Sequence, residues 1–210
     1  MKNTIIIVLI YSLPFTSYGQ LNDDIEIGFN FGLNTSAVTN SAEFGDSSDS
    51  NHGINLGASI DYYFSRNFSL KAKLIYDQKG WENKFIIDPN SGIVYNNNNT
   101  LDYNLNYLTI PIAVNWHFGK IFYINLGPYV GILLGAKETG TDSNIKNNFE
   151  SIDYGLQMGV GVKIPINDKY KIFFEWEGQG GLPDIATINY DSTVYNSRGS
   201  FNLGVNFVLK

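Results

Sequence analysis

Eight stretches of this sequence alternate apolar and polar residues with a period of two, and their polar positions are rich in glycine and asparagine. The clearest covers 25–33, where isoleucine, phenylalanine and leucine alternate with glutamate, glycine and asparagine. Successive side chains of a β-strand point to opposite faces, so the pattern predicts strands with one apolar and one small, polar face. Two architectures fit: a soluble lipocalin-like barrel with the apolar face inside, and an outer-membrane barrel with that face toward lipid.

The N-terminus has the features of a secretory signal peptide. Lys2 precedes an apolar run at 5–10, and Ser17 and Gly19 occupy the −3 and −1 positions of a cleavage site. The apolar run is shorter than the ~20 residues of a membrane-spanning helix, and no other segment resembles one. Because the chain has no cysteine, disulfide scaffolds and thiolate metal sites are excluded. We predict a signal peptide over 1–19 and a single barrel domain over 20–210.

Strands and connections alternate in a regular rhythm along the chain. Strands are expected at 25–33, 53–64, 68–76, 103–118, 122–134, 152–164, 170–176 and 201–209. Short turns are expected at 65–67, 119–120 and 167–169, and long loops at 35–52, 82–102, 138–151 and 180–199. A change of parity in the fourth stretch predicts a β-bulge near Tyr107. This alternation of short turns and long loops between strands predicts an all-β fold: an eight-stranded antiparallel up-and-down transmembrane β-barrel with four long extracellular loops and short periplasmic turns.

Glycines and aromatic residues favour the arrangement with the apolar face toward lipid. The polar face holds glycines at 28, 32, 57, 127, 131, 135, 155, 159, 161 and 204, which suit the narrow lumen of an eight-stranded barrel. Aromatic residues flank the short turns, as in the interfacial girdle of a membrane barrel. These residues are Phe64, Phe68, Trp116, Phe118, Phe122, Tyr170 and Phe207.

The most distinctive polar feature is a predicted lumenal network of charged residues. Its members share the polar face: Glu26, Asp61, Lys71, Lys73, Asp77, Lys163, Lys171, Glu175 and Glu177. Asp153 and Lys137 are assigned to the same face, which then carries six acids and five bases. Asp61 is expected opposite Lys71, and Glu175 and Glu177 are expected to meet Lys163 or Lys171. Nearly balanced charge in a narrow bore favours a salt-bridged plug over an ion-lined pore or gate, which stays open as the alternative.

Other polar residues offer weaker signals for chemistry. His52 follows the Ser-Ser-Asp-Ser run at 47–50, which invites a Ser-His-Asp interpretation. A catalytic constellation must be held rigidly, however, and these residues are neighbours in one loop. We therefore predict no enzymatic activity, no cofactor and no metal site, and we expect His117 to be a hydrogen-bonded lumenal or rim residue. An acidic chain with net charge −6 and no basic patch is not expected to bind nucleic acid.

Three short motifs carry a resemblance to a known family. They are Tyr-Leu-Thr-Ile-Pro at 107–111, Gly-Pro-Tyr at 127–129 and Leu-Gly-Val-Asn-Phe at 203–207. With the signal peptide and the glycine-rich lumen, they resemble the PorT-like outer-membrane β-barrel family over about residues 20–210. The resemblance implies fold and location. The role of PorT in protein secretion does not carry over, and the final Leu209-Lys210 departs from the terminal aromatic residue of many such barrels, so Phe207 is expected to serve instead.

These features predict a protein exported to the outer membrane of a Gram-negative-type bacterium. Its expected partners are outer-membrane lipid and lipopolysaccharide, with periplasmic chaperones and the barrel-assembly machinery acting during insertion. Three functions stay open. The first is a non-enzymatic structural or surface-interaction role through acidic extracellular loops, with an unidentified envelope or surface partner. The second is a narrow channel for small solutes or ions, and the third is an accessory role in a secretion or assembly system.

Overall fold

The computed structural model describes residues 24–40, 48–87, 94–139, 143–187 and 194–209, and the predicted signal peptide at 1–19 lies outside them. The long strands are β1 (Ile25–Asn40), β2 (Ser48–Tyr63), β3 (Phe68–Ile87), β4 (Val94–Phe118), β5 (Phe122–Thr139), β7 (Ile152–Pro165), β8 (Tyr170–Gly181) and β9 (Val194–Leu209). The connection from β5 to β7 holds the short strand β6 (Ser143–Asn144) and the 3-10 helix η1 (Lys146–Asn148). Within the described ranges, no helix is long and apolar enough to span a membrane.

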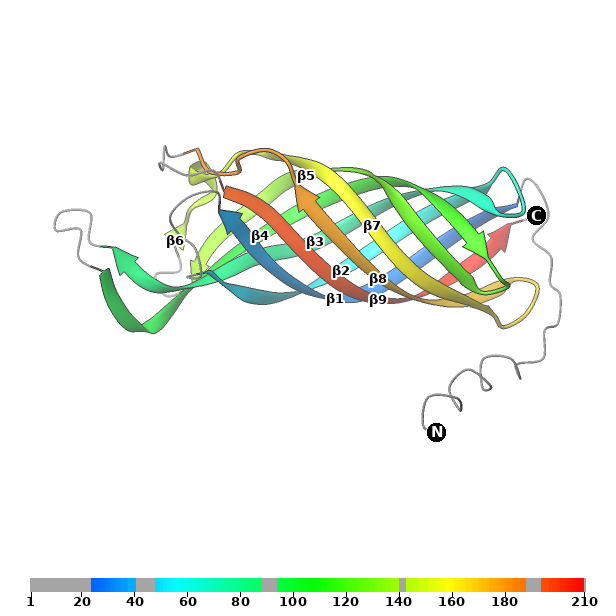
Figure 1. Cartoon of the computed structure of the whole chain (residues 1–210), viewed down its shortest axis with the longest axis horizontal. Helices are drawn as coiled ribbons and strands as arrows, with labels where there is room; N and C mark the ends of the chain where they lie inside the picture. The colour runs from blue at the N-terminus through cyan, green and yellow to red at the C-terminus, as the bar shows by residue number, and fades with distance from the viewer. Residues whose placement is uncertain (1–23, 41–47, 88–93, 140–142, 188–193, 210) are drawn as a thin grey trace, which may run out of the picture.

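The eight long strands close into one barrel (Figure 1). Each pairs antiparallel with its neighbours in the order β4-β3-β2-β1-β9-β8-β7-β5, and pairing of β4 with β5 completes the ring. The first strand pairs with the last, with Ile25 opposite Leu209. Closure removes exposed sheet edges along the paired parts of the strands. The predicted eight-stranded antiparallel up-and-down barrel is confirmed.

The two ends of the barrel differ in their connections. At one end, here called the turn end, short turns join β2 to β3, β4 to β5 and β7 to β8, and the described chain begins and finishes there (Figure 1). At the opposite end, the loop end, the longer connections join the remaining strands. The predicted short turns at 65–67, 119–120 and 167–169 therefore lie together at one end.

The strands extend further toward the loop end than the sequence pattern predicts. β1 continues to Asn40 and β2 begins at Ser48, although a loop was expected over 35–52. The β3–β4 hairpin reaches Ile87 and Val94, and it projects past the rest of the barrel (Figure 1). The loops predicted at 82–102, 138–151 and 180–199 are likewise partly strand. Apolar alternation marks only the part of a strand that faces lipid, whereas ladder hydrogen bonds continue beyond it.

Burial in the barrel is the reverse of that in a soluble protein. Apolar side chains cover the outside: Phe29 is 54% exposed, Leu126 60% and Phe201 71%. Charged side chains fill the inside, where Glu26 is 0% exposed and Asp61 1%. Exposed apolar surface on this scale is stable only in contact with hydrocarbon. The apolar face is therefore the lipid-facing surface, as predicted.

The predicted bulge lies at Tyr107, but the extra residue belongs to the partner strand. Tyr107 pairs with Leu133 while the preceding Asn106 pairs with Gly135, so Leu134 is inserted on β5. β4 itself keeps its parity, and the side chain of Tyr107 is buried inside the barrel. The insertion reverses the parity of β5 instead. Lys137 consequently points outward and is exposed, so its assignment to the lumen is wrong.

Glycines on the inner face make room for large side chains. A Cβ atom at Gly161 would lie 2.5 Å from Cζ of Tyr123, and Cβ atoms at Gly28 and Gly204 would overlap Asn206 and Phe173. Tyr123 donates a hydrogen bond to Glu175 over 2.8 Å, which restrains its ring. The space at Gly161 is therefore fixed by its surroundings.

We expect Gly161→Ala to lower the free energy of unfolding by about 1–3 kcal/mol, because the added methyl group overpacks the lumen. Gly135→Ala is the matched control, since no heavy atom lies within 4 Å of a Cβ atom placed there. Urea titration of the barrel in lipid vesicles measures both variants. Equal stabilities for the two would contradict the packing argument.

Inside the loop end, the side chains change from polar to apolar. Buried apolar residues form a cluster here named the loop-end core: Trp81, Leu105, Tyr107, Leu133, Ala136 and Ile185. On the outer face at this level, Thr35 and His52 are exposed and pair across β1 and β2. Along the same strands, the inner face therefore changes from polar to apolar, and the outer face changes from apolar to polar. Where water replaces lipid outside, the barrel packs like a soluble protein.

Candidate functional site

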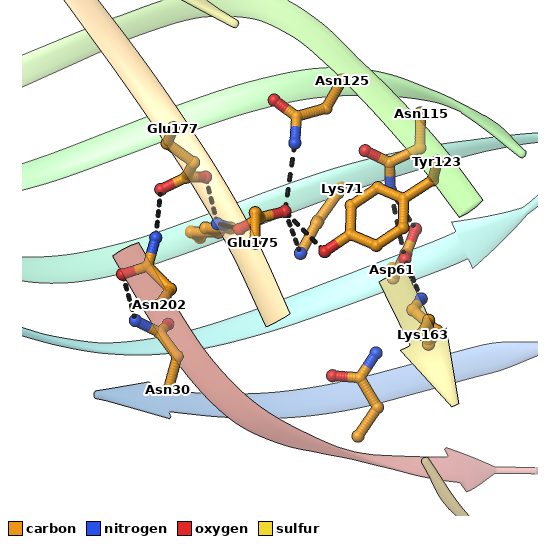
Figure 2. A network of polar contacts seen from close by, with 12 residues as sticks. Asn30, Asp61, Lys71, Asn115, Tyr123, Asn125, Lys163, Glu175, Glu177 and Asn202 are labelled. Carbon is orange, nitrogen blue, oxygen red and sulfur yellow. Dashed lines mark hydrogen bonds and ion pairs between the residues drawn. The ribbon is translucent and has the colours of Figure 1, made fainter. Parts of the chain in front are cut away.

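The bore of the barrel is the candidate functional site, since it gathers charged residues from most strands. All nine residues of the predicted lumenal network lie on the inner face; eight are buried and Lys171 is half-buried. They come from β1 (Glu26), β2 (Asp61), β3 (Lys71, Lys73, Asp77), β7 (Lys163) and β8 (Lys171, Glu175, Glu177). Figure 2 shows part of this network from close by.

The cluster nearest the turn end is centred on Lys163. Its ammonium group lies 2.7 Å from Oε2 of Glu26 and 3.0 Å from Oδ2 of Asp61, and it donates a 2.7 Å hydrogen bond to Tyr63. Lys171 approaches the other oxygen of Glu26 at 2.5 Å. β7 and β2 lie four strands apart in either direction around the ring. The contact from Lys163 to Asp61 therefore crosses the full width of the bore.

A second cluster crosses the bore between β3 and β8, which also lie opposite one another. Lys71 lies 3.3 Å from Oε2 of Glu175 (Figure 2). Lys73 is paired with both Glu175 and Glu177. Tyr123 donates to Glu175 over 2.8 Å and Asn125 over 3.0 Å. Each carboxylate is thus held by several donors, as a buried charge requires.

A third cluster lies nearer the loop end. Nε of Arg198 is 3.0 Å from Oδ1 of Asp77, and NH1 is 3.9 Å from Oε2 of Glu177. Lys79 lies 3.0 Å from Oδ2 of Asp153. Sequence reasoning left both out of the network because Lys79 follows the last clearly alternating residue of its strand, and Arg198 precedes the first one of its strand. Continuing the parity of the strands past those residues would have found both.

The six acids and six bases of these clusters balance. The acids are Glu26, Asp61, Asp77, Asp153, Glu175 and Glu177, and the bases are Lys71, Lys73, Lys79, Lys163, Lys171 and Arg198. The structure replaces the predicted Lys137 with Lys79 and Arg198, which makes the balance complete. Carboxamides fill the remaining space: Asn30 donates to Asn55 over 2.9 Å, and Asn55 donates to Asn202 over 3.0 Å.

The ion pairs connect different partners from those expected. Asp61 lies opposite Lys71 in the β2–β3 register, as predicted, but Lys71 is paired with Glu175. Glu175 and Glu177 are paired with bases on β3 and β9, so the expectation that they meet Lys163 or Lys171 is wrong. A lysine side chain reaches across this narrow bore. Reasoning from adjacent strands does not anticipate such contacts.

The loop-end core lies inside the barrel on the loop-end side of the charged clusters. Ile185, from the connection between β8 and β9, is fully buried in it. Its amide donates to the carbonyl of Val194 over 2.9 Å, and its carbonyl accepts from the amide of Glu150 over 2.8 Å. A β-bridge between Phe149 and Ala186 adds a further link between the two connections. Two of the long connections therefore hold each other over the mouth of the barrel.

The two histidines occupy ordinary polar environments. His117 has Nε2 2.9 Å from the Ser69 hydroxyl, and its ring packs 4.9 Å from that of Tyr63 at the turn end. His52 is exposed, with Nδ1 3.4 Å from the Thr35 hydroxyl. Ser47, part of the possible Ser-His-Asp set, lies outside the described residues. Among those that are described, no group of three or more acids and histidines is arranged to hold a metal ion.

Comparisons with known proteins agree with this architecture. The family model described as an outer membrane protein beta-barrel domain matches residues 18–187. The outer membrane protein AlkL, determined in DMPC bilayers, shares 15% identity and a TM-score of 0.53, with 95% of this chain and 96% of that chain covered. OprG from Pseudomonas aeruginosa shares 11% identity and a TM-score of 0.52, with coverage of 91% and 98%. These two likenesses concern the fold alone.

The search of curated proteins found no match. The family match nevertheless covers most of the chain, and the lipid-facing surface and closed barrel described above are those of a membrane-spanning protein. The protein lies in the outer membrane of a Gram-negative-type bacterium, and the chain belongs to the outer membrane protein beta-barrel domain family.

Proposed function

We propose that this protein is a non-enzymatic and non-conducting barrel whose loop end serves as an anionic interaction surface outside the cell. The observation that carries the proposal is the separation of charge. The bore is neutral and packed, whereas unbalanced charge gathers at the loop end. Such a distribution suits a barrel that presents a surface to partners rather than one that passes solutes.

The sequence places the excess negative charge in the segments at the loop end. Segments 35–52, 82–102, 137–151 and 182–197 together contain eleven acids and three lysines, a net charge of −8 (3 − 11). Short turns of outer-membrane barrels face the periplasm and longer connections face outward. In that orientation the acidic segments lie at the cell surface. They would attract cationic partners, or divalent cations shared with lipopolysaccharide.

Binding of octalysine to the barrel in neutral phosphatidylcholine vesicles tests the surface role. We expect binding that weakens as salt is raised, and that weakens at fixed salt in the triple variant Glu82→Gln, Glu138→Gln, Glu150→Gln. Asp168→Asn, at the turn end, is the control and should leave binding unchanged. Absence of binding, or equal binding by the triple variant, would contradict an anionic surface role.

The packed bore predicts no stable channel of porin size in planar-bilayer recordings. Ion pairs between opposite walls and the loop-end core both obstruct the path. A steady conductance of the size measured for a general porin, recorded under the same conditions, would favour the alternative, a narrow channel for solutes or ions. Recordings at several voltages separate a closed barrel from one that opens only transiently.

The remaining expectations from the sequence belong to the same proposal. Residues 1–19 would act as a cleaved signal peptide, and chaperones and the barrel-assembly machinery would carry the chain to the membrane. An accessory role in secretion or assembly is the third hypothesis, and the resemblance to PorT-like barrels does not by itself support it. Stoichiometric co-purification of envelope proteins from gently solubilised membranes would support that role over an independent surface function.

A further inference from the structure

The lipid-facing surface is not uniform, because an apolar groove of about 540 Å³ crosses it. The groove spans outward side chains of five neighbouring strands, β5, β7, β8, β9 and β1. Its main lining residues are Phe122, Val160, Phe174, Trp176, Phe201 and Phe31. Paired positions arrange these side chains in two rows across the strands. One row contains Val160, Trp176 and Phe201, and the other contains Phe122, Phe174 and Phe31.

Large aromatic side chains make the walls of the groove stiff. Trp176 packs over the backbone of Gly178, where an added Cβ atom would lie 3.3 Å from Cη2 of the indole. Because Gly178 has no side chain, the indole of Trp176 lies directly against the backbone at that position. A preformed apolar groove binds a flexible chain at lower cost than a surface that must first rearrange.

The groove begins near the turn end on β5 and β7, and its residues on β9 and β1 lie further along their strands toward the loop end. Phe122 is the first residue of β5, and Val162, which also lines the groove, is three residues from the end of β7 at Pro165. In the orientation usual for outer-membrane barrels, the end of the groove on β5 and β7 meets the periplasmic leaflet. Lys120, exposed in the β4–β5 turn, precedes Phe122 by two residues. The ammonium group of Lys120 therefore lies at the depth of the lipid headgroups, where lysine side chains extend from the apolar band toward the headgroups.

We propose that this groove holds one acyl chain of an anionic phospholipid from the periplasmic leaflet, with the headgroup phosphate at Lys120. The groove is continuous with a surface already wetted by hydrocarbon, so an acyl chain enters without crossing water. An empty groove would leave its aromatic walls without contacts on one side. A two-fold pairing of barrels through this face would bring two concave surfaces together and leave a void between them.

Native tryptophans allow a direct test by quenching with brominated lipid. Trp81→Phe, Trp116→Phe leaves Trp176 as the reporter in the groove, and Trp81→Phe, Trp176→Phe leaves Trp116, which is exposed in the turn-end girdle. The barrel is placed in phosphatidylcholine vesicles with increasing fractions of phosphatidylglycerol brominated on its acyl chains. We expect quenching of Trp176 to saturate at a mole fraction several-fold lower than that of Trp116, which should rise in proportion to bulk lipid.

Two variants separate the parts of the site. Val160→Phe fills the groove, and should make the quenching of Trp176 rise in proportion to bulk lipid. Lys120→Gln leaves the groove intact, and should remove the preference for brominated phosphatidylglycerol over brominated phosphatidylcholine. Proportional quenching of Trp176 in the parent chain would overturn the proposal. Shielding of Trp176 from quenching together with dimer-sized particles would also overturn it, in favour of a second copy. Neither outcome bears on the surface role of the loop end.

Discussion

Replacing Lys163 with methionine is expected to lower the free energy of unfolding by about 3–5 kcal/mol, because it leaves buried carboxylates without their cation. Lys163 is the shared partner of Glu26 and Asp61, at 2.7 Å and 3.0 Å, and its side chain is 5% exposed. Methionine keeps the unbranched stem of the side chain but not its ammonium group. Lys171 remains beside Glu26, whereas Asp61 keeps only neutral hydrogen-bond partners such as Asn115. Urea titration in lipid vesicles measures the change.

Two further variants show whether charge is the cause. Lys169→Met removes an exposed lysine from the β7–β8 turn and should change stability by no more than about 0.5 kcal/mol. The double variant Lys163→Met, Asp61→Asn should recover part of the loss, since it removes the uncompensated carboxylate. If Lys163→Met proves as mild as Lys169→Met, the bridges across the bore do not hold the barrel together.

Met158→Arg is expected to cost about 2–4 kcal/mol, the penalty for an arginine at the bilayer midplane of a membrane barrel. Met158 is 55% exposed on the outer face, near the middle of β7, and it lies opposite Leu126 on β5. Met158→Leu is the matched control for packing and should be close to neutral. Thr35→Arg, on the outer face beyond the apolar band, should also be tolerated. Similar stability of all three variants in vesicles would mean that water, and not lipid, wets this face.

The fold was largely predictable from the sequence because lipid imposes a two-residue period on every spanning strand. The outward residues Phe29, Leu126 and Phe201 and the inward charges all follow that period. The ends of the strands were not predictable in the same way. Beyond the lipid, apolar side chains turn inward, and Leu105 and Tyr107 therefore seemed to break the pattern of β4. They belong instead to the loop-end core.

The identity of the lumenal residues was also predictable, but their pairing was not. Alternation assigns Lys71 and Glu175 to the inner face without saying how far apart they lie. Contact across the bore depends on closure of the ring and on the stagger between strands, which bring β3 opposite β8. The assignment of Lys137 to the lumen was wrong for a related reason. A single inserted residue on β5 reverses the face that Lys137 occupies.

A spin-label scan along β7 tests most directly whether hydrocarbon wets the outer face. The chain has no cysteine, so single cysteines introduced one at a time at the even, outward positions from residue 152 to residue 164 carry a nitroxide at one known position each. In vesicles, labels at these even positions should be accessible to oxygen and shielded from a polar nickel reagent. Even positions open to the nickel reagent, in a chain that stays monodisperse without detergent, would contradict the membrane-barrel account.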